Sequence, residues 1–247
     1  MPHASTAIPP DVRPEIVLSD DELADELLRL TDWYTDELFA GLAELGATLF
    51  VNDLSRFVFD PERFLDDSTE PMAARGQGVV YWLGTRSQLL REASTEVRDR
   101  HVNQRYRPYH MALDALVSEQ LEGAGECLVV DCHSFPSVPL PSELDQDLDR
   151  PDICIGTDPV HTPAALAFAV QEAFAMEGLR VRRDAPFAGT FVPGGYFGTD
   201  ARVHSVMVEV RRDLYMDEAT AERLPGLGTV AAAITRALKA ALAATST

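Results

Sequence analysis

The sequence predicts an α/β fold, a single-domain three-layer sandwich whose central sheet is mixed and mainly parallel. Helical patterns alternate with short apolar runs along the whole chain of 247 residues. One such run, at residues 126–136 (ECLVVDCHSFP), ends abruptly in polar residues, which is typical of a strand buried on both faces of a sheet. No internal repeat and no change in composition marks a boundary, so residues 1–247 are expected to form one domain.

The N-terminal half is predicted to contain helices, short extended segments and a surface loop. Ser19 followed by Glu22 is a capping-box pattern, and leucines at helical spacing continue to residue 45, with a break expected at residues 31–32. Gly46 is expected to end this region. The further elements expected before residue 126 are a strand at 47–51, an extended segment at 56–59, a surface loop at 66–78, and helices at 89–104 and 108–122.

The C-terminal half is predicted to alternate strands with helices. Residues 136–163 are rich in proline and acidic side chains, and we expect them to form a long loop over the mouth of a site. Thr162 is the expected cap of a helix that reaches residue 176. The remaining expected elements are a strand at 179–182, a glycine-rich loop at 188–198, a strand at 203–210 and a terminal helix at 229–244.

Composition narrows the possible classes of function. The formal net charge of −19 argues against nucleic acid or an anionic membrane as a partner. No apolar run approaches the roughly 20 residues of a membrane span, and no signal peptide is visible. The cysteines Cys127, Cys132 and Cys154 have no metal-binding spacing, and their odd number fits a reducing compartment. We therefore expect a cytoplasmic protein.

His133 is the strongest candidate for a metal ligand. Ligands of open α/β sheets bind beyond the carboxyl ends of the strands, where Asp131 and His133 are expected to lie. Because the two residues are two positions apart on a strand, they lean toward the same side, and Asp131 is expected to orient the imidazole. Cys132 points to the opposite face, and we interpret it as a buried thiol rather than a nucleophile.

Charged residues within apolar segments are further candidates. Glu209 stands in the apolar run 206–210, where burial raises the pKa of an unpaired carboxyl group and suits it to general-base chemistry; an ion pair is the alternative. Arg56, Arg63 and Arg212 lie beside extended apolar segments, where each needs either a protein carboxylate or an anionic ligand. The sequence contains no HExxH, CxxC, GxSxG or P-loop motif.

A series of motifs, taken in order, resembles the N-formylglutamate amidohydrolase family over residues 2 to about 216. The most specific match is the segment DCHS at 131–134. The other matches are PHAS at 2–5, Asp32, SR at 55–56 followed by Asp60 and Arg63, PYH at 108–110, PFAGT at 186–190, and VEVRRDLYM at 208–216. The resemblance implies the phosphorylase/hydrolase-like fold shared with zinc carboxypeptidases and aspartoacylases.

The resemblance also implies a zinc site. His3, Asp32 and His133 would bind one Zn²⁺ per chain, with Asp36, one helical turn further on, as the alternative carboxylate. Such a metal would lower the pKa of a bound water molecule and polarise the scissile carbonyl group.

Roles around the metal follow from the same resemblance. Glu209 would act as the general base, and Arg56 or Arg63 would stabilise the oxyanion or bind a substrate carboxylate. The substrate-binding residues that the resemblance implies are Arg63, His110, Thr190 and Arg212.

The implied reaction is hydrolysis of the amide bond of a small-molecule N-acyl amino acid, in particular of N-formyl-L-glutamate to formate and L-glutamate. The alternatives are a deacylase or carboxypeptidase-like enzyme with another N-acyl amino acid as substrate, or a catalytically inactive binding relative. Two departures from the family pattern bear on this choice: Glu62 stands where the family has asparagine, and the strand that precedes the Pro-His turn in the family is missing. The oligomeric state is expected to be monomer or homodimer.

Overall fold

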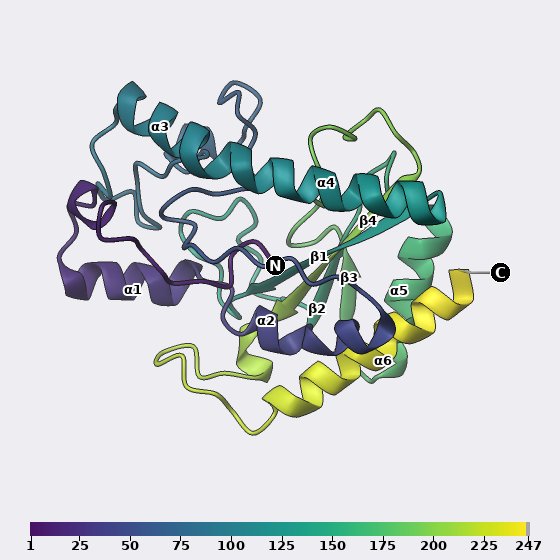
Figure 1. The fold of residues 1–247 in the computed structure, drawn as a ribbon. Helices are drawn as coiled ribbons and strands as arrows, with labels where there is room; N and C mark the ends of the chain where they lie inside the picture. The colour runs from purple at the N-terminus through teal and green to yellow at the C-terminus, as the bar shows by residue number, and fades with distance from the viewer. Residues whose placement is uncertain (246–247) are drawn as a thin grey trace.

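The computed structural model describes residues 1–245, whose centre is a four-stranded sheet (Figure 1). The strand order is β1-β4-β2-β3. Parallel pairing joins β1 to β4 and β2 to β3, while β2 and β4 are antiparallel. The predicted mixed, mainly parallel sheet is thus confirmed. The strand bounds are β1 (Cys127–Phe135), β2 (Ile153–Gly156), β3 (Val181–Arg183) and β4 (Val203–Arg211).

Alternation along β1 and β4 gives the sheet two different faces. On one face, Cys132 and the even-numbered valines of β4 belong to the largest apolar core. Three helices pack against this face: α2 (Thr35–Leu38), α5 (Ala164–Met176) and α6 (Leu227–Thr245). On the other face, Val117 of the long helix α4 (Arg107–Ala124) packs on the amino-terminal ends of β1 and β4. Helices therefore flank the sheet, as Figure 1 shows.

The N-terminal helices follow the sequence prediction closely. Helix α1 (Asp20–Leu30) begins with the expected capping box, in which Ser19 accepts from the Glu22 amide and Glu22 reaches back to the Ser19 amide. It ends at the expected break, and α2 and the 3₁₀ helix η2 (Ala40–Leu45) follow. Gly46 then takes φ of 88°, a left-handed conformation that favours glycine at a helix end. The break at residues 31–32 is important because the Asp32 amide donates to the His3 carbonyl (3.0 Å).

The prediction of a strand at residues 47–51 was wrong. Within the described residues this segment joins no sheet; it runs beside the N-terminus instead. The Met1 ammonium donates to the Phe50 carbonyl (3.0 Å), and the Asn52 amide donates to the Met1 carbonyl (3.1 Å). A segment with high strand propensity therefore forms backbone hydrogen bonds with the first residue of the chain rather than with a strand of the sheet. Strand propensity alone does not reveal which partner is used.

Several other elements begin or end at residues different from those predicted. The helix expected at 89–104 begins only at Thr95: α3 (Thr95–His101) passes through the π-helical turn η4 (Val102–Tyr106) directly into α4. Strand β2 lies inside the segment that was predicted to be a loop. Thr162 caps no helix through its side chain; its hydroxyl donates to the Ser205 carbonyl (2.6 Å), and Pro163 occupies the cap position of α5. Short 3₁₀ turns occur at Arg13–Glu15, Ala73–Arg75 and Arg212–Leu214.

Helix α6 qualifies the expectation that no apolar run approaches the length of a membrane span. By length and composition alone its 19 residues would be sufficient to cross a membrane. Packing accounts for this apolar character, because Val230, Ile234, Ala237 and Leu238 are buried in the main core beside the sheet. A helix that is buried along one side passes the same test as a membrane helix.

Candidate metal centre and active site

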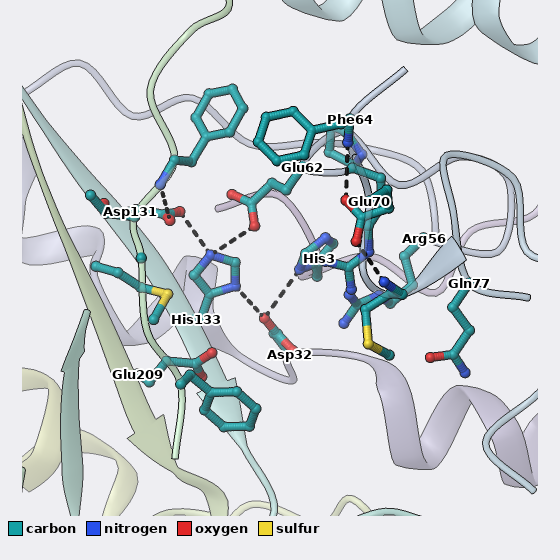
Figure 2. A pocket seen from close by; sticks show the side chains of 18 of the residues that line it. His3, Asp32, Arg56, Glu62, Phe64, Glu70, Gln77, Asp131, His133 and Glu209 are labelled. Atoms are coloured by element: carbon teal, nitrogen blue, oxygen red, sulfur yellow. Dashed lines mark hydrogen bonds and ion pairs between the residues drawn. The ribbon is translucent and has the colours of Figure 1, made fainter. Parts of the chain in front are cut away.

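A cavity of about 1000 Å³ opens where β1 and β4 end, on the face of the sheet opposite the main core. All nine residues that the sequence predicted for the site line this cavity: His3, Asp32, Arg56, Arg63, His110, His133, Thr190, Glu209 and Arg212. Five separate parts of the chain supply them, namely the N-terminus, the loop after α1, the segment before α3, the start of α4, and the sheet with its adjoining loops. Figure 2 shows five of them around the cavity: His3, Asp32, Arg56, His133 and Glu209.

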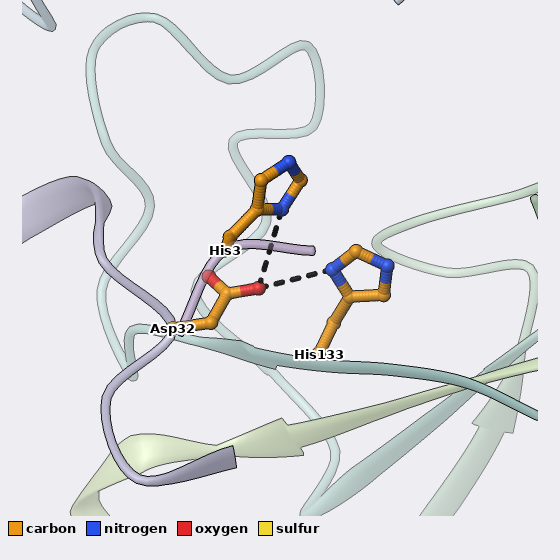
Figure 3. A group of neighbouring side chains, drawn as sticks. All are labelled: His3, Asp32 and His133. Carbon is orange, nitrogen blue, oxygen red and sulfur yellow. Dashed lines mark hydrogen bonds and ion pairs between the residues drawn. The ribbon is translucent and has the colours of Figure 1, made fainter. Parts of the chain in front are cut away.

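The three predicted metal ligands meet inside the protein (Figure 3). His3, Asp32 and His133 are buried, and their ligand atoms lie within 4.8 Å of one another, so the group can hold a metal ion. Asp32 Oδ2 lies 3.0 Å from His133 Nδ1 and 3.5 Å from His3 Nδ1. The alternative ligand Asp36 is not among the residues that line the cavity.

Each imidazole also has a carboxylate on its far side. His3 Nε2 lies 2.9 Å from Asp60 Oδ1, and His133 Nε2 lies 2.8 Å from Asp131 Oδ1. When Nε2–H donates to these carboxylates, the Nδ1 lone pair of both rings faces the same point, which is the arrangement of metal-bound histidines. His3 Nδ1 is in addition buried without a hydrogen-bond partner. A buried nitrogen without a protein partner, beside the Asp32 carboxylate, fits the role of a cation ligand. The expected contact between Asp131 and the His133 imidazole is present.

Charge at the site is tightly balanced. Burial opposes ionisation of Asp32, but the two imidazoles hold the pKa of its carboxyl group below the usual value. Burial likewise opposes protonation of His133, yet the carboxyl groups of Asp131 and Glu62 hold its pKa well above the usual value. In the metal-free protein, His133 therefore carries a proton that a cation would have to displace.

Asp60 belongs to the ordered sequence motifs, but no role was predicted for it. It is fully buried, and its carboxylate contacts His3, Arg56 Nη2 (2.8 Å) and the Tyr81 hydroxyl (2.6 Å). Although burial opposes ionisation, Arg63 and the other cationic neighbours hold the pKa of Asp60 well below its usual value. A carboxylate three residues before Arg63 in an apolar segment was the available signal. What the sequence could not show is that His3, 57 residues away, shares it.

Glu209 lies directly beside the metal ligands. It pairs in register with His133 across β1 and β4, so the two side chains leave the sheet on the same face. Burial raises the pKa of Glu209 to about 8, and its Oε2 atom has no hydrogen-bond partner. The ion pair considered as an alternative does not form among the described residues. A buried carboxyl group with a free oxygen and a raised pKa can exchange a proton near neutral pH.

The three arginines differ in what they leave available. Arg212 is buried and donates to Asp32 Oδ1 (3.1 Å) and the Ser134 carbonyl (3.0 Å), so it fixes the ligand carboxylate. All three nitrogens of the Arg56 guanidinium donate to protein oxygens. The Nε atom of Arg63 lies 3.4 Å from Asp60, but its terminal nitrogens have no protein acceptor among the described residues. Arg63 is thus the one of the three with donors free for an anion.

His110 and Thr190 line the cavity but are held by the protein. His110 Nε2 lies 2.8 Å from the Pro61 carbonyl, and burial lowers the pKa of the imidazole. The Thr190 hydroxyl shares a hydrogen bond with the Ser205 hydroxyl (2.7 Å). Both positions can shape the cavity wall.

Glu62 stands on the far side of His133. Its Oε2 atom lies 3.1 Å from His133 Nε2, next to Asp131, and Figure 2 shows its side chain directed toward both. Burial and the adjacent Asp131 carboxylate raise the pKa of Glu62. The residue that departs from the family motif is therefore part of the cavity wall beside the metal ligands.

This fold and this two-histidine, one-carboxylate cluster are typical of metal-dependent hydrolases. Comparison with known proteins narrows the class. Residues 1–216 match N-formylglutamate amidohydrolase as a family, and the chain belongs to that family. The chain is 31% identical to the N-formylglutamate deformylase of Pseudomonas putida over 230 residues, with 88% of this chain and 80% of that protein covered. It is 30% identical to the protein of the same name from Pseudomonas aeruginosa over 225 residues, with 88% and 81% covered.

Solved structures agree with the assignment. The structure is similar to that of N-formylglutamate amidohydrolase from Ralstonia eutropha, with a TM-score of 0.79, 26% identity, and 99% of this chain and 92% of that chain covered. A gene product of Agrobacterium tumefaciens has the same fold, with a TM-score of 0.68, 21% identity, and 99% and 89% covered.

Proposed function

We propose that this protein is a zinc-dependent amidohydrolase that cleaves the amide bond of N-acyl amino acids, with N-formyl-L-glutamate, named in its relatives, as the reference substrate. The observation that carries the proposal is the arrangement around Asp32. Two imidazoles direct Nδ1 toward one carboxylate oxygen, each is backed by a buried carboxylate, and Glu209 stands beside them. Two histidines, one carboxylate and an open cavity are the components of a hydrolytic zinc site.

The chain's own residues supply the remaining steps. His3, Asp32 and His133 would hold the metal, which when bound lowers the pKa of water and polarises a carbonyl group. Glu209 takes the proton from the attacking water and passes it to the leaving nitrogen, because its free Oε2 atom is held beside the ligands. Arg63 binds the substrate carboxylate through its free terminal nitrogens.

Arg56 and Arg212 have different parts in this proposal from those first expected. Because Arg212 donates to Asp32 and to backbone carbonyls, it orients the ligand carboxylate rather than the substrate. Arg56 borders the cavity with 12% of its side chain exposed, and it holds the Asp60 carboxylate beneath His3. A substrate oxyanion would share the guanidinium of Arg56 with Asp60.

The anchoring of His3 supports an active enzyme over an inactive binding relative. A ligand so near the chain start holds a metal only if its backbone is fixed. Here the His3 carbonyl accepts from the Asp32 amide (3.0 Å), and the Pro2 carbonyl accepts from the Asn52 side chain (3.0 Å). His3 itself is 3% exposed.

Metal analysis and product analysis together test the proposal. We expect about one zinc per chain in the purified protein and formate release from N-formyl-L-glutamate. His133→Ala should lose both the metal and the activity, whereas His204→Ala, at a partly exposed histidine outside the cavity, should keep both. Full zinc occupancy without hydrolysis of any N-formyl or N-acyl amino acid would contradict the proposal.

A further inference from the structure

Exposed apolar side chains line the same cavity as the candidate metal ligands. They are Phe64, Leu65, Met111, Leu144 and Phe197, which we call the apolar wall. These side chains are between 36% and 70% exposed, yet they all line the same cavity. Exposed apolar side chains gathered in one cavity are characteristic of a ligand-binding surface.

The two aromatic residues of the apolar wall are held in place by buried polar groups. Glu70 is 6% exposed, and its carboxylate accepts from the Phe64 amide (3.1 Å) and the Met72 amide (2.9 Å), which fixes the loop that carries Phe64. His161, fully buried, accepts from the Gly198 amide (2.8 Å), and its ring stacks on Phe197 with centroids 6.0 Å apart. The rings of Phe64 and Phe197 are themselves 6.0 Å apart. The surrounding protein therefore holds both rings in fixed positions in which they remain exposed to the cavity.

The volume and the charges of the cavity also favour a large ligand with a single carboxylate. About 1000 Å³ is at the upper end of the range for small-molecule sites. Of Arg56, Arg63 and Arg212, only Arg63 keeps terminal nitrogens free, so the part of the cavity next to the metal ligands offers a cationic partner for one carboxylate; Arg107 also lines the cavity. The neighbouring wall carries the carboxyl groups of Glu62 and Asp131, which lie 3.1 Å and 2.8 Å from His133 Nε2 and offer a second substrate carboxylate no cationic partner.

We infer that the preferred substrate is an N-acyl amino acid with a single carboxylate and a large apolar group, which occupies the apolar wall, rather than a dianionic N-acyl amino acid. The inference rests on the proposed amidohydrolase function. Arg63 would bind the one carboxylate, and the apolar group would extend across Phe64 and Phe197. The apolar group can belong either to the amino-acid side chain or to the acyl chain.

A substrate series tests this inference with the zinc-loaded wild-type protein. The measured quantity is kcat/KM for N-formyl-L-phenylalanine, N-octanoylglycine and N-formyl-L-glutamate, each divided by the value for N-formylglycine. We expect a gain of about tenfold or more for at least one of the apolar compounds and no gain for N-formyl-L-glutamate. A gain with N-formyl-L-phenylalanine alone places the amino-acid side chain on the apolar wall, and a gain with N-octanoylglycine alone places the acyl chain there.

Two outcomes overturn the inference, and they can be told apart. If N-formyl-L-glutamate is the best substrate, the inferred preference is wrong while the amidohydrolase function stands. If no compound in the series is hydrolysed at full zinc occupancy, the proposed function fails and the inference fails with it.

Variants locate the preference within the cavity. Phe64→Ala and Phe197→Ala should each lower the ratio for the apolar substrate by about tenfold. Met176→Ala, which removes an exposed apolar side chain on α5 outside the cavity, should leave this ratio unchanged. Glu62→Gln should raise the ratio for N-formyl-L-glutamate by about tenfold. Because each ratio compares two substrates in one variant, a general loss of metal or stability cancels; unchanged ratios in all three cavity variants would contradict the inference.

Discussion

Replacement of Glu209 by glutamine should have opposite effects on catalysis and on stability. The substitution keeps the size of the side chain and removes its ability to carry a proton to and from the site. Loss of a general base typically reduces kcat by about 10²- to 10⁴-fold. The three metal ligands remain in place, so zinc content should not change.

The stability effect follows from the raised pKa. In the folded, metal-free protein the pKa of Glu209 is about 8, compared with an ordinary value of 4.5. The folded protein therefore keeps a proton that the unfolded chain has released, so stability falls as pH rises from about 4.5 to about 8 and is constant above that. One pKa unit corresponds to about 1.4 kcal/mol, and since Glu209 interacts closely with charged neighbours, we expect a total cost of roughly 2 to 5 kcal/mol. Glu209→Gln removes this cost.

Denaturant unfolding of the metal-free wild-type and Glu209→Gln proteins between pH 5 and pH 8.5 measures the effect. The variant should be more stable, by an amount that increases with pH up to about 8. Glu119→Gln, at an exposed glutamate on α4, is the matched control and should unfold like the wild type at every pH. Equal pH dependence in Glu209→Gln and wild type, or retention of turnover by the variant, would refute the reasoning.

Three other predictions concern the support of the site and the core. Asp60→Asn should weaken zinc affinity by about 10- to 100-fold in a chelator competition, because His3 loses its orienting carboxylate, whereas Asp53→Asn at an exposed position should not. Arg63→Met should raise KM by about tenfold or more with a smaller change in kcat, and an unchanged KM would exclude Arg63 as the carboxylate receptor. Phe174→Ala in the fully buried core should cost about 3 to 5 kcal/mol in urea unfolding while zinc content is retained.

Local sequence signals predicted much of the fold. The capping box at Ser19, the apolar runs that became β1 and β4, and the break at residues 31–32 all appear in the structure. Each is set by interactions between residues close in sequence or by a clear burial pattern. The strand predicted at residues 47–51 does not form, because the Phe50 carbonyl and the Asn52 amide pair with the backbone of Met1 instead of a strand, a contact between segments far apart in sequence. Strand β2 was missed because a four-residue buried strand within a proline-rich segment has too short a pattern to recognise.

The sequence by itself determined which segments meet at the site, since all nine residues that the ordered motifs assigned to it lie among those that line the cavity. Only the tertiary structure decided how they are used. Arg212 looked equally suited to bind a substrate or a protein carboxylate, and the choice was made by the loop after α1, which brings Asp32 to within 3.1 Å of its guanidinium. The contact between Asp60 and His3 likewise depends on folding, because it joins residues that are 57 positions apart in sequence. Partners of a buried charge are set by distances between segments far apart in sequence, and these distances exist only once the chain is folded.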